Sequence, residues 1–495
     1  MRGEGRFARW RLLCAATLGV ALLGGGNVQG QDFIRGDANA DGLVSLVDVL
    51  TILNVVFNEE ETECRKALDI DDTGALDISD AINAIDYLFQ NGLTPPAPFP
   101  ACGEDPTADS LSCDNGTAAC RLGGPIDGLT AAEILSFNRG RVLMSKRFTP
   151  EEGLGPLYNS TSCDSCHDKP VVGGSAPTYR NFFLHQIGEA GPDQYRLEEL
   201  PSDVMPSYNG FTGRRPVIPT APFGPDGDEV RVSQRNAPPF FGTGLFEFIS
   251  DATILANADP EDSDDDGISG RYNTDGSGNL GRFGFKAQAN FIEAFIRGAA
   301  MNQMGMTTDP IDGSDGIVSL ALLQIGAGPD TPTTDDDGIP DPEISTEDFG
   351  DIINFCRFVR PPKPLPMSAD ALDGEVLFDD LGCTSCHIPS LDSSRGPVNA
   401  YTDLLLHDMG PDLADGIHQG TPQFSTIELF TTVSEFRTQP LWGLRHHAPF
   451  LHDGRADTIA EAIEAHGGEA AESRDAYLDL TEEERNQLIE FLEAL

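Results

Sequence analysis

The chain has 495 residues, with 80 acidic and 32 basic side chains and a formal net charge of −48 at pH 7. This length exceeds what one hydrophobic core usually serves, so two to four domains are expected. The negative charge makes nucleic acid and anionic membrane surfaces poor partners. The same charge favours calcium or a basic protein as a binding partner, or simply indicates a solvated acidic surface. These interpretations can be true together.

Residues 1–30 have the pattern of a secretory signal peptide. Four arginines precede a short apolar run from Leu12 to Leu23, and small residues follow up to Gly30. The apolar run is too short to span a bilayer, and the sequence offers no other candidate span. We therefore expect an exported protein, periplasmic or extracellular, without a membrane span.

Residues 31–92 contain two similar acidic loops, each followed by an apolar helical stretch. Both loops place oxygen-bearing side chains at positions 1, 3, 5, 9 and 12 and glycine at position 6, which is the spacing of EF-hand-type calcium loops. The alternative is a pair of acidic loops that bind no metal. The expected ligands are Asp37, Asn39, Asp41, Ser45 and Asp48 in the first loop and Asp69, Asp71, Thr73, Asp77 and Asp80 in the second.

This region resembles dockerin type I modules, which are paired calcium loops that are each followed by one helix. Aspartate stands at position 12 of both loops, as Asp48 and Asp80, where many calcium loops have glutamate. The resemblance implies bound Ca2+ and docking onto a cohesin-like partner.

Residues 93–125 are predicted to form a linker, because the proline-rich segment 95–100 is stiff and extended. In an exported protein, the nearby cluster of four cysteines predicts two disulfides, with three possible pairings. Cys356 lies in an apolar stretch and is expected to be a buried thiol. The clustered cysteines are Cys64, Cys102, Cys113 and Cys120.

Two pentapeptides, residues 163–167 and 383–387, read C-x-x-C-H, the attachment signature of c-type haem. Two thiols at this spacing can form thioethers with one porphyrin, and the following histidine supplies the proximal ligand. The alternatives are a redox dithiol or half of a zinc site, and the sequence lacks the surroundings that either needs. The expected attachment residues are Cys163, Cys166, Cys383 and Cys386, and the expected iron ligands are His167 and His387.

Each pentapeptide follows a short amphipathic stretch that contains a glycine, Gly140 or Gly374, so a diverged duplication is expected. The chain ends on a helical stretch in which Thr481 and Glu484 predict a capping box. The expected fold is mainly α: a small paired calcium-loop module, then two cytochrome c-like haem domains with long loops. Their expected ranges are 126–365 and 366–495.

The region after residue 126 resembles the bacterial di-haem oxidoreductase family, peroxidase-like proteins once called thiol oxidoreductases. That family is similar to the di-haem cytochrome c peroxidases and to the di-haem enzyme that matures methylamine dehydrogenase. The resemblance implies two covalently bound haem c groups, one reacting with peroxide or a similar oxidant and one passing electrons from a redox partner protein or a small electron donor. The matching segments are residues 153–159, 244–247, 266–271, 281–287, 436–445, 450–455 and 465–470.

The resemblance also places individual site residues. His466 stands where the peroxidases' electron-transfer haem has its distal methionine, so it is expected to be the sixth ligand of the second haem; a surface histidine is the alternative. Glu247 falls where the peroxidases keep a catalytic glutamate; a structural carboxylate is the alternative. For the distal side of the first haem, His185 and an open or water-bound iron are both compatible. His407 is expected to be a structural residue whose ring nitrogens are satisfied, and His407 with Met409 is a fallback ligand pair.

Three further expectations concern residues around the haems. His452 is expected to support a haem pocket without binding iron. Trp442 is expected to pack in the core, with electron relay as the alternative. The acidic loop at residues 262–266 repeats the first calcium-loop positions, so a third calcium is a hypothesis beside a solvated loop; residues 333–338 repeat them more weakly.

Two other functions fit the same sequence. One is a pure electron carrier in which both irons are six-coordinate. The other is a haem-containing binding protein that is docked through residues 31–92. Peroxide turnover separates the enzyme from both.

Overall fold

The computed structural model describes residues 32–187, 230–308, 339–418 and 431–495, apart from short gaps at 41, 43, 59, 63, 91, 101, 114–116, 118–119, 121, 156–157, 159 and 276–277. The expected signal peptide, Asp41 and the weak acidic loop at 333–338 therefore lie outside the described residues. The described part is mainly helical with two small two-stranded sheets, as expected. Within it, no helix is both long and apolar enough to cross a membrane.

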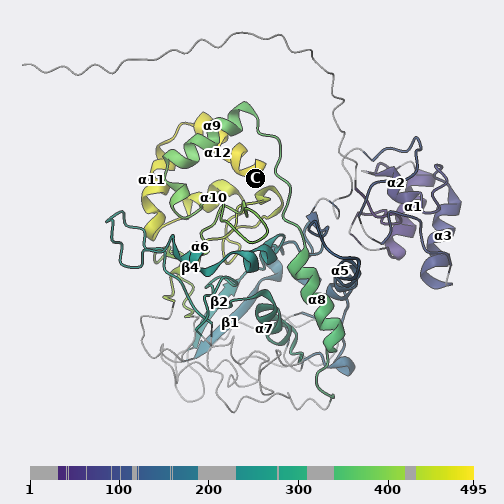
Figure 1. Cartoon of the computed structure of the whole chain (residues 1–495), viewed down its shortest axis with the longest axis horizontal. Coiled ribbons are helices and arrows are strands. Elements are labelled where there is room, and N and C mark those ends of the chain that lie inside the picture. Colours follow the sequence, from purple (N-terminus) through teal and green to yellow (C-terminus); the bar gives the residue numbers. More distant parts are fainter. Residues whose placement is uncertain are drawn as a thin grey trace, which may run out of the picture.

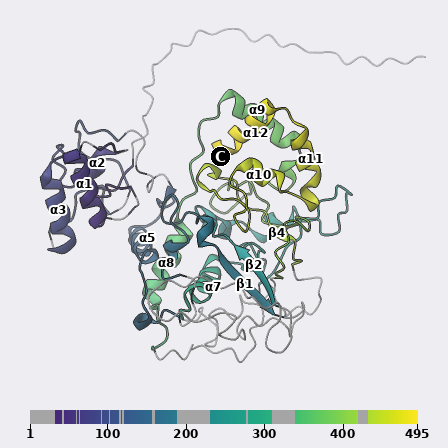
Figure 2. The same cartoon turned by 180° about the vertical axis from the view of Figure 1, so that it is seen from behind.

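The N-terminal module consists of α1 (Leu46–Asn58), α2 (Arg65–Leu68) and α3 (Ile78–Phe89). Helices α1 and α3 pack against each other, with Ile52 and Ala84 fully buried in a small core of their own. The module lies to one side of the larger body that carries both pentapeptides (Figures 1 and 2).

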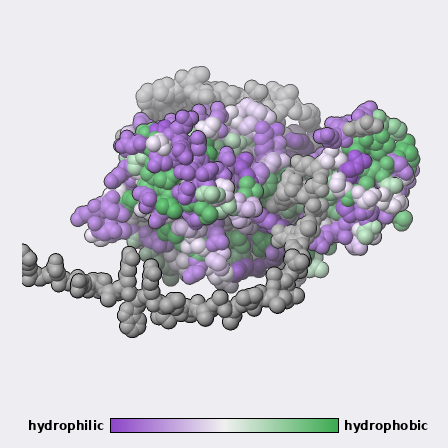
Figure 3. Space-filling model, turned by 90° about the horizontal axis from the view of Figure 1, so that it is seen from above, coloured by the Kyte–Doolittle hydropathy of each residue, from purple (hydrophilic) through white to green (hydrophobic). Residues whose placement is uncertain are grey.

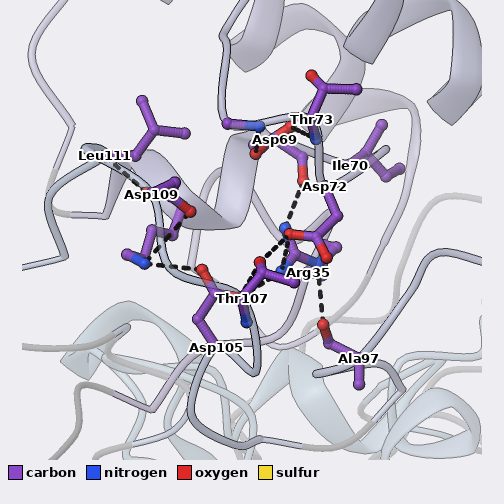
Figure 4. Close-up of polar contacts among 12 residues, drawn as sticks. Arg35, Asp69, Ile70, Asp72, Thr73, Ala97, Asp105, Thr107, Asp109 and Leu111 are labelled. Atoms are coloured by element: carbon purple, nitrogen blue, oxygen red, sulfur yellow. Dashed lines mark hydrogen bonds and ion pairs between the residues drawn. The ribbon is translucent and has the colours of Figure 1, made fainter.

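The segment that we predicted as a linker packs back onto this module. Phe33 and Gly103 form an isolated antiparallel bridge. The fully buried guanidinium of Arg35 donates to the carbonyl oxygen of Ala97 (3.1 Å) and to the carboxylate of Asp105 (2.9 Å) (Figure 4). A buried cation needs such acceptors, and the segment supplies them, so its stiffness does not keep it apart from the module.

One disulfide joins the module to this segment and a second lies within the segment, which confirms the predicted number and selects the pairing. Cys64 bonds Cys113, and Cys102 bonds Cys120. The choice between pairings needed the tertiary structure, because sequence spacing leaves all three open.

Two pairs of packed helices form a large part of the larger body. Helix α5 packs against α8, and α9 packs against α12. The predicted capping box of Thr481 and Glu484 begins the last of these helices. Their bounds are α5 Ala131–Met144, α8 Thr346–Phe358, α9 Ala369–Asp380 and α12 Glu482–Ala494.

The two pairs cross in the same way. A Cβ added to Gly140 on α5 would lie 2.0 Å from the carbonyl oxygen of Asp351 on α8, and one added to Gly374 on α9 would lie 2.1 Å from that of Gln487 on α12. Glycine thus allows the same close backbone contact in both halves, which agrees with the predicted duplication.

The remaining elements lie between and around these pairs. Strands β1 and β2 are antiparallel, as are β3 and β4. The larger core lies around α5, α7 and α8, and a smaller one lies around α9 and α12. The bounds are β1 Phe182–Ile187, β2 Val230–Arg235, β3 Leu406–Asp408, β4 Glu435–Arg437, α6 Asp251–Leu255, α7 Ile292–Met304, α10 Ile459–Glu464 and α11 Ala471–Asp479.

Candidate haem sites and calcium loops

Each C-x-x-C-H segment begins with one turn of 3-10 helix, Cys163–Ser165 or Cys383–Ser385. In each segment both cysteines and the histidine line one cavity. None of these four cysteines takes part in a disulfide. Burial raises the pKa of Cys163 and of Cys383 to about 12, which is the opposite of what a reactive redox dithiol needs.

The first cavity has a volume of about 290 Å³ and is lined mainly by apolar groups. The ring of His167 projects from the attachment turn, and its Nδ1 donates to the carbonyl oxygen of Gly174 (3.0 Å). A carbonyl can only accept, so this bond fixes the tautomer and leaves Nε2 with a lone pair for iron. Cys356, confirmed as a buried thiol, lines the same cavity.

Helix α7 supplies the side of the first cavity that the sequence analysis missed. Ile292, Ile296, Ala299 and Gln303 recur on one face of this helix and line the cavity together. Their spacing of three and four residues is the signal that could have shown this face. Because most of the face is apolar, it keeps this part of the cavity dry.

The second cavity, of about 210 Å³, brings His387 and His466 together. The Nδ1 atom of His387 donates to the carbonyl of Tyr401 (2.9 Å), and that of His466 donates to the carbonyl of Ala462 (2.6 Å). Each bond leaves Nε2 as the acceptor that a metal requires. Burial lowers the pKa of His387 to about 4, and the nearby His466 adds to this shift. The ligand role of His466 stays a prediction that this placement favours.

The loop after His466 is fixed by the carboxylate of Glu469. That carboxylate accepts from the Ser269 hydroxyl (2.6 Å), from the Asp408 backbone N–H (3.2 Å) and from His407 (2.7 Å). The backbone oxygen of His466 accepts from Arg474 (2.8 Å). The candidate ligand is therefore held by contacts to three other parts of the chain.

The structure gives His407 the structural role that was its first expectation and contradicts its fallback role as an iron ligand. Its Nε2 is bonded to Asp403 (2.8 Å) and its Nδ1 to Glu469 (2.7 Å), so neither nitrogen offers iron a lone pair. Burial alone would lower the pKa of His407, but these carboxylates and Cys386 raise it well above the usual value. The other member of the pair, Met409, does line the second cavity.

Glu247 lies where its carboxylate stabilises an element instead of facing the first cavity. One oxygen accepts from the backbone N–H of Ile292 at the start of α7 (2.8 Å), and the other accepts from Arg357 (2.7 Å). Glu247 is not among the described residues that line the first cavity. The catalytic role of Glu247 stays a prediction. The two hydrogen bonds of its carboxylate are those expected of the alternative, a structural carboxylate.

The sequence analysis singled out three further aromatic residues, His452, Trp442 and His185. His452 stacks on Phe436 with 4.3 Å between ring centroids and lines the second cavity. Trp442 stacks on the buried ring of Phe246 (5.7 Å) and packs against the larger core, which confirms the expected packing. His185 lies opposite Val232 in the β1–β2 pair, and its side chain is outside the described part.

The two acidic loops of the module have matching backbones. Positive φ angles fall at position 4 (Ala40, 62°; Asp72, 60°) and at position 6 (Gly42, 92°; Gly74, 76°). In both loops the position-6 N–H donates to the position-1 aspartate, and the position-9 N–H donates to the position-12 aspartate. The internal repeat read from the sequence is therefore a repeat of conformation as well.

The second loop gathers oxygens suited to a divalent cation. Carboxylate oxygens of Asp69, Asp71 and Asp80 lie within 4.8 Å of one another. Oδ1 of Asp71 is buried and has no hydrogen-bond partner among the described residues. Burial raises the pKa of Asp80 to about 7, with Asp71 and Asp69 adding to the shift. These residues fit calcium, which prefers oxygen ligands. Asp77 instead uses its carboxylate in the capping box of α3.

The loop at residues 262–266 repeats part of this pattern on the surface. Oxygens of Asp262, Asp264 and Asp266 also lie within 4.8 Å of one another, and the N–H of Gly267 donates to Asp262 (3.1 Å). At position 12, however, Asn273 donates to the carbonyl of Lys286 (2.8 Å). The third calcium stays a hypothesis.

Comparison with known proteins gives two partial sequence relatives. The chain is 30% identical over 135 residues to the methylamine utilization protein MauG of Methylorubrum extorquens, which covers 26% of this chain and 35% of that protein. It is 30% identical over 162 residues to the cytochrome-c peroxidase IdrP1 of Denitromonas iodatirespirans, covering 26% of this chain and 41% of that protein. The chain thus spans less than half the length of either relative.

Two solved structures resemble this chain, but their TM-scores are too low to support a conclusion about its fold or function. Hydrazine synthase of Kuenenia stuttgartiensis gives a TM-score of 0.30 at 15% identity and covers 79% of this chain and all of that one. A MauG-like protein associated with microbial copper homeostasis gives 0.35 at 16% identity, with 76% of this chain and 91% of that one covered.

One family model matches more than half of the chain. It is described as "Di-haem oxidoreductase, putative peroxidase" and matches residues 226–495. This range holds the second attachment segment, α7, α8 and His466, while the first attachment segment precedes it. The chain belongs to the di-haem oxidoreductase family.

Proposed function

We propose that this protein is an exported di-haem c-type oxidoreductase of the peroxidase type. The first haem reacts with peroxide or a similar oxidant, and the second transfers electrons. The observation that carries this proposal is the asymmetry of the two cavities. Five histidines line the second cavity, among them His387 and His466 with their Nδ1 atoms bonded to backbone carbonyls, whereas His167 is the one histidine among the described residues that line the first.

When bound, a c-type haem supplies one-electron redox chemistry and, at an open iron position, reaction with the oxidant. Cys163 and Cys166 would attach the first haem, and His167 would ligate it through Nε2. Cys383 and Cys386 would attach the second, with His387 and His466 as its two ligands. The bonds of these histidines to backbone carbonyls orient the rings and raise their basicity.

The first cavity offers neutral polar groups to an oxidant. Gln288 and Gln303 line it, and their amides can both donate and accept hydrogen bonds. Glu247 contacts α7, which carries Gln303, and would act on the cavity through the position of that helix.

The test is the absorption and EPR spectrum of purified protein with two haems, before and after peroxide, together with peroxide consumption in the presence of an electron donor. A high-spin ferric component that peroxide alters, with turnover, is the expected result. Two low-spin haems that peroxide leaves unchanged in both the oxidised and the half-reduced protein would identify a pure electron carrier.

A second function, docking through the N-terminal module, is favoured by its exposed apolar residues. These belong to α1 and α3, and green areas cover the module at the right of Figure 3. We infer that calcium orders the two loops and that a cohesin-like domain covers this apolar face. The residues of the face are Leu46, Val47, Leu50, Phe57, Ile78, Ile82 and Phe89, each at least half exposed.

Binding of the full chain to a cohesin domain, measured calorimetrically with calcium and then with a chelator, tests the docking function. Leu50→Glu and Ile82→Glu are expected to abolish binding, because each puts a charge into the apolar face. Leu93→Glu is the matched control, since Leu93 is 94% exposed and lies outside both helices. Binding that survives both substitutions in the face would exclude it as the docking surface.

A further inference from the structure

The two haem cavities have five residues in common, which form a shared wall between them. Four of these residues are uncharged. The fifth, Arg437, ends strand β4 and is 7% exposed. The shared wall consists of Pro238, Phe285, Arg437, Gln439 and Pro440.

Among the described residues, Arg437 is bonded to uncharged acceptors only. Its Nε donates to the carbonyl of Gly284, its Nη1 to that of Thr438 and its Nη2 to the side-chain oxygen of Gln439, each at 3.0 Å. A guanidinium has five N–H groups, so two of them have no partner within the described part of the chain. Among the described residues, no carboxylate is in ion-pair contact with Arg437. Its pKa is lowered to about 10 by burial, and Asp403 offsets this only in part.

Further positive charge is buried beside the shared wall. The guanidinium of Arg235, which lines the first cavity, lies 5.2 Å from the ring of Phe285. Arg235 and the fully buried Lys286 share one carboxylate, that of Asp415. Two buried cations thus share this carboxylate, whereas Arg437 has no carboxylate in ion-pair contact among the described residues. A buried cation is costly unless an opposite charge offsets it.

We propose that Arg437 binds a propionate carboxylate of each haem, so that one guanidinium joins the two cofactors. Haem carries two propionates on the edge opposite the vinyl groups that the attachment cysteines take. The planar fork of arginine suits carboxylates and can bind more than one of them. The inference rests on the proposed binding of two haems and goes beyond it by naming the residue that couples them.

The role predicts a redox effect at both haems. A positive charge next to a haem favours the reduced form, because reduction adds a negative charge. Removing a charge that touches both haems therefore lowers both midpoint potentials. A purely structural role for Arg437 would change stability without this paired shift.

The experiment is a spectroelectrochemical titration of full-length protein loaded with haem, comparing wild type with R437Q, R437K and R445Q. Arg445 is the matched control: it donates to the carbonyls of Glu493 (3.0 Å) and Lys363 (2.7 Å) but lines neither cavity. Haem content is measured first by the pyridine haemochrome assay. A wild-type protein without two haems would refute the proposed cofactor content and not the role of Arg437.

The expected result is that R437Q lowers both midpoint potentials, R437K lowers them less, and R445Q leaves them unchanged. Unchanged potentials in R437Q, or a shift at one haem only, would overturn the proposal. If R437Q does not fold with both haems, the resonance Raman spectrum of R437K tests the proposal through its propionate bending bands. Bands displaced from wild type at both haems support the bridge, and unchanged bands overturn it.

Discussion

At the second haem cavity, the hydrogen bond from Nδ1 of His466 to Ala462 leaves Nε2 free beside His387. The same arrangement occurs at His167 and His387, so each of these three histidines keeps on Nε2 the lone pair that a metal ligand requires. His407 shows the opposite case, because both of its nitrogens are bonded to carboxylates. The hydrogen-bond partner of each ring nitrogen therefore decides whether a histidine can bind a metal.

Substituting His466 by glutamine should convert the second haem from low spin to high spin, because the imidazole ligand is lost while the attachment cysteines remain. The EPR and visible spectra of protein with two haems measure this. His452→Gln is the control, since His452 lines the same cavity but stacks on Phe436. A His466→Gln protein that keeps two low-spin haems would remove His466 from the ligand set.

Substituting Glu247 by glutamine separates proton transfer from a structural role. Loss of a proton-transferring group should slow peroxide turnover by about 10²–10⁴-fold. The bonds of Glu247 to Ile292 and Arg357 lead us to expect a smaller effect on turnover. Glu247→Ala should instead lower the free energy of unfolding by about 1 kcal/mol through loss of the α7 cap. Turnover and thermal unfolding of the same preparations decide between the roles.

Among the elements, the two helix pairs and the two acidic loops each occur twice with the same geometry. Gly140 and Gly374 stand at equivalent crossings. Ala40 and Asp72 share a left-handed backbone at equivalent loop positions. Repeated geometry at repeated sequence positions indicates that each unit is specified locally and then packed as a whole.

Substituting Gly140 by alanine should destabilise the first helix pair by about 1–3 kcal/mol, because the added Cβ would overlap a backbone oxygen that cannot move freely. Gly350→Ala on α8 is the matched control. A Cβ there meets nothing within 4 Å, so it should stabilise the same pair by up to about 1 kcal/mol. Chemical denaturation followed by circular dichroism measures both. Equal effects of the two substitutions would exclude the close crossing.

Removing calcium with a chelator should lower the unfolding temperature of the N-terminal module. The carboxylates of Asp69, Asp71 and Asp80 then repel one another in a buried site. At a calcium concentration 100 times the dissociation constant the stabilisation is about 2.7 kcal/mol. Calorimetry should show that Asp80→Asn reduces the calcium-dependent shift to the part that the first loop contributes, and that Asp262→Asn, in the exposed loop, keeps the full shift. An undiminished shift in Asp80→Asn would contradict the assignment of the second loop.

Over the whole molecule, the formal charge of −48 dominates encounters with other proteins. Hydrophilic side chains cover much of the face of the larger body seen in Figure 3, while apolar side chains gather on the module. Long-range attraction therefore favours a basic electron donor at the larger body, and short-range burial favours docking at the module.

Electron transfer from a basic cytochrome should slow by about tenfold or more between low and physiological salt, because salt screens the attraction. Stopped-flow reduction rates at several ionic strengths measure this. A small uncharged donor is the control and should show little salt dependence. Equal salt dependence for both donors would exclude electrostatic steering.

Features whose chemistry is complete within a few neighbouring residues could be predicted from the amino-acid sequence alone. The attachment cysteines with His167 and His387, the paired acidic loops and the capping box of Thr481 belong here, because spacing along the chain sets their geometry. The helical class and the duplication followed for the same reason. The resemblance added His466, which the structure then placed beside His387.

Features that join distant residues followed from the tertiary fold. It selected the disulfide pairing, packed the predicted linker against Arg35, and bonded Glu247 to Arg357, 110 residues away. It also brought Arg437 from β4 to a wall that it forms with Phe285. Packing of whole elements fixes such contacts, and no spacing along the chain encodes them.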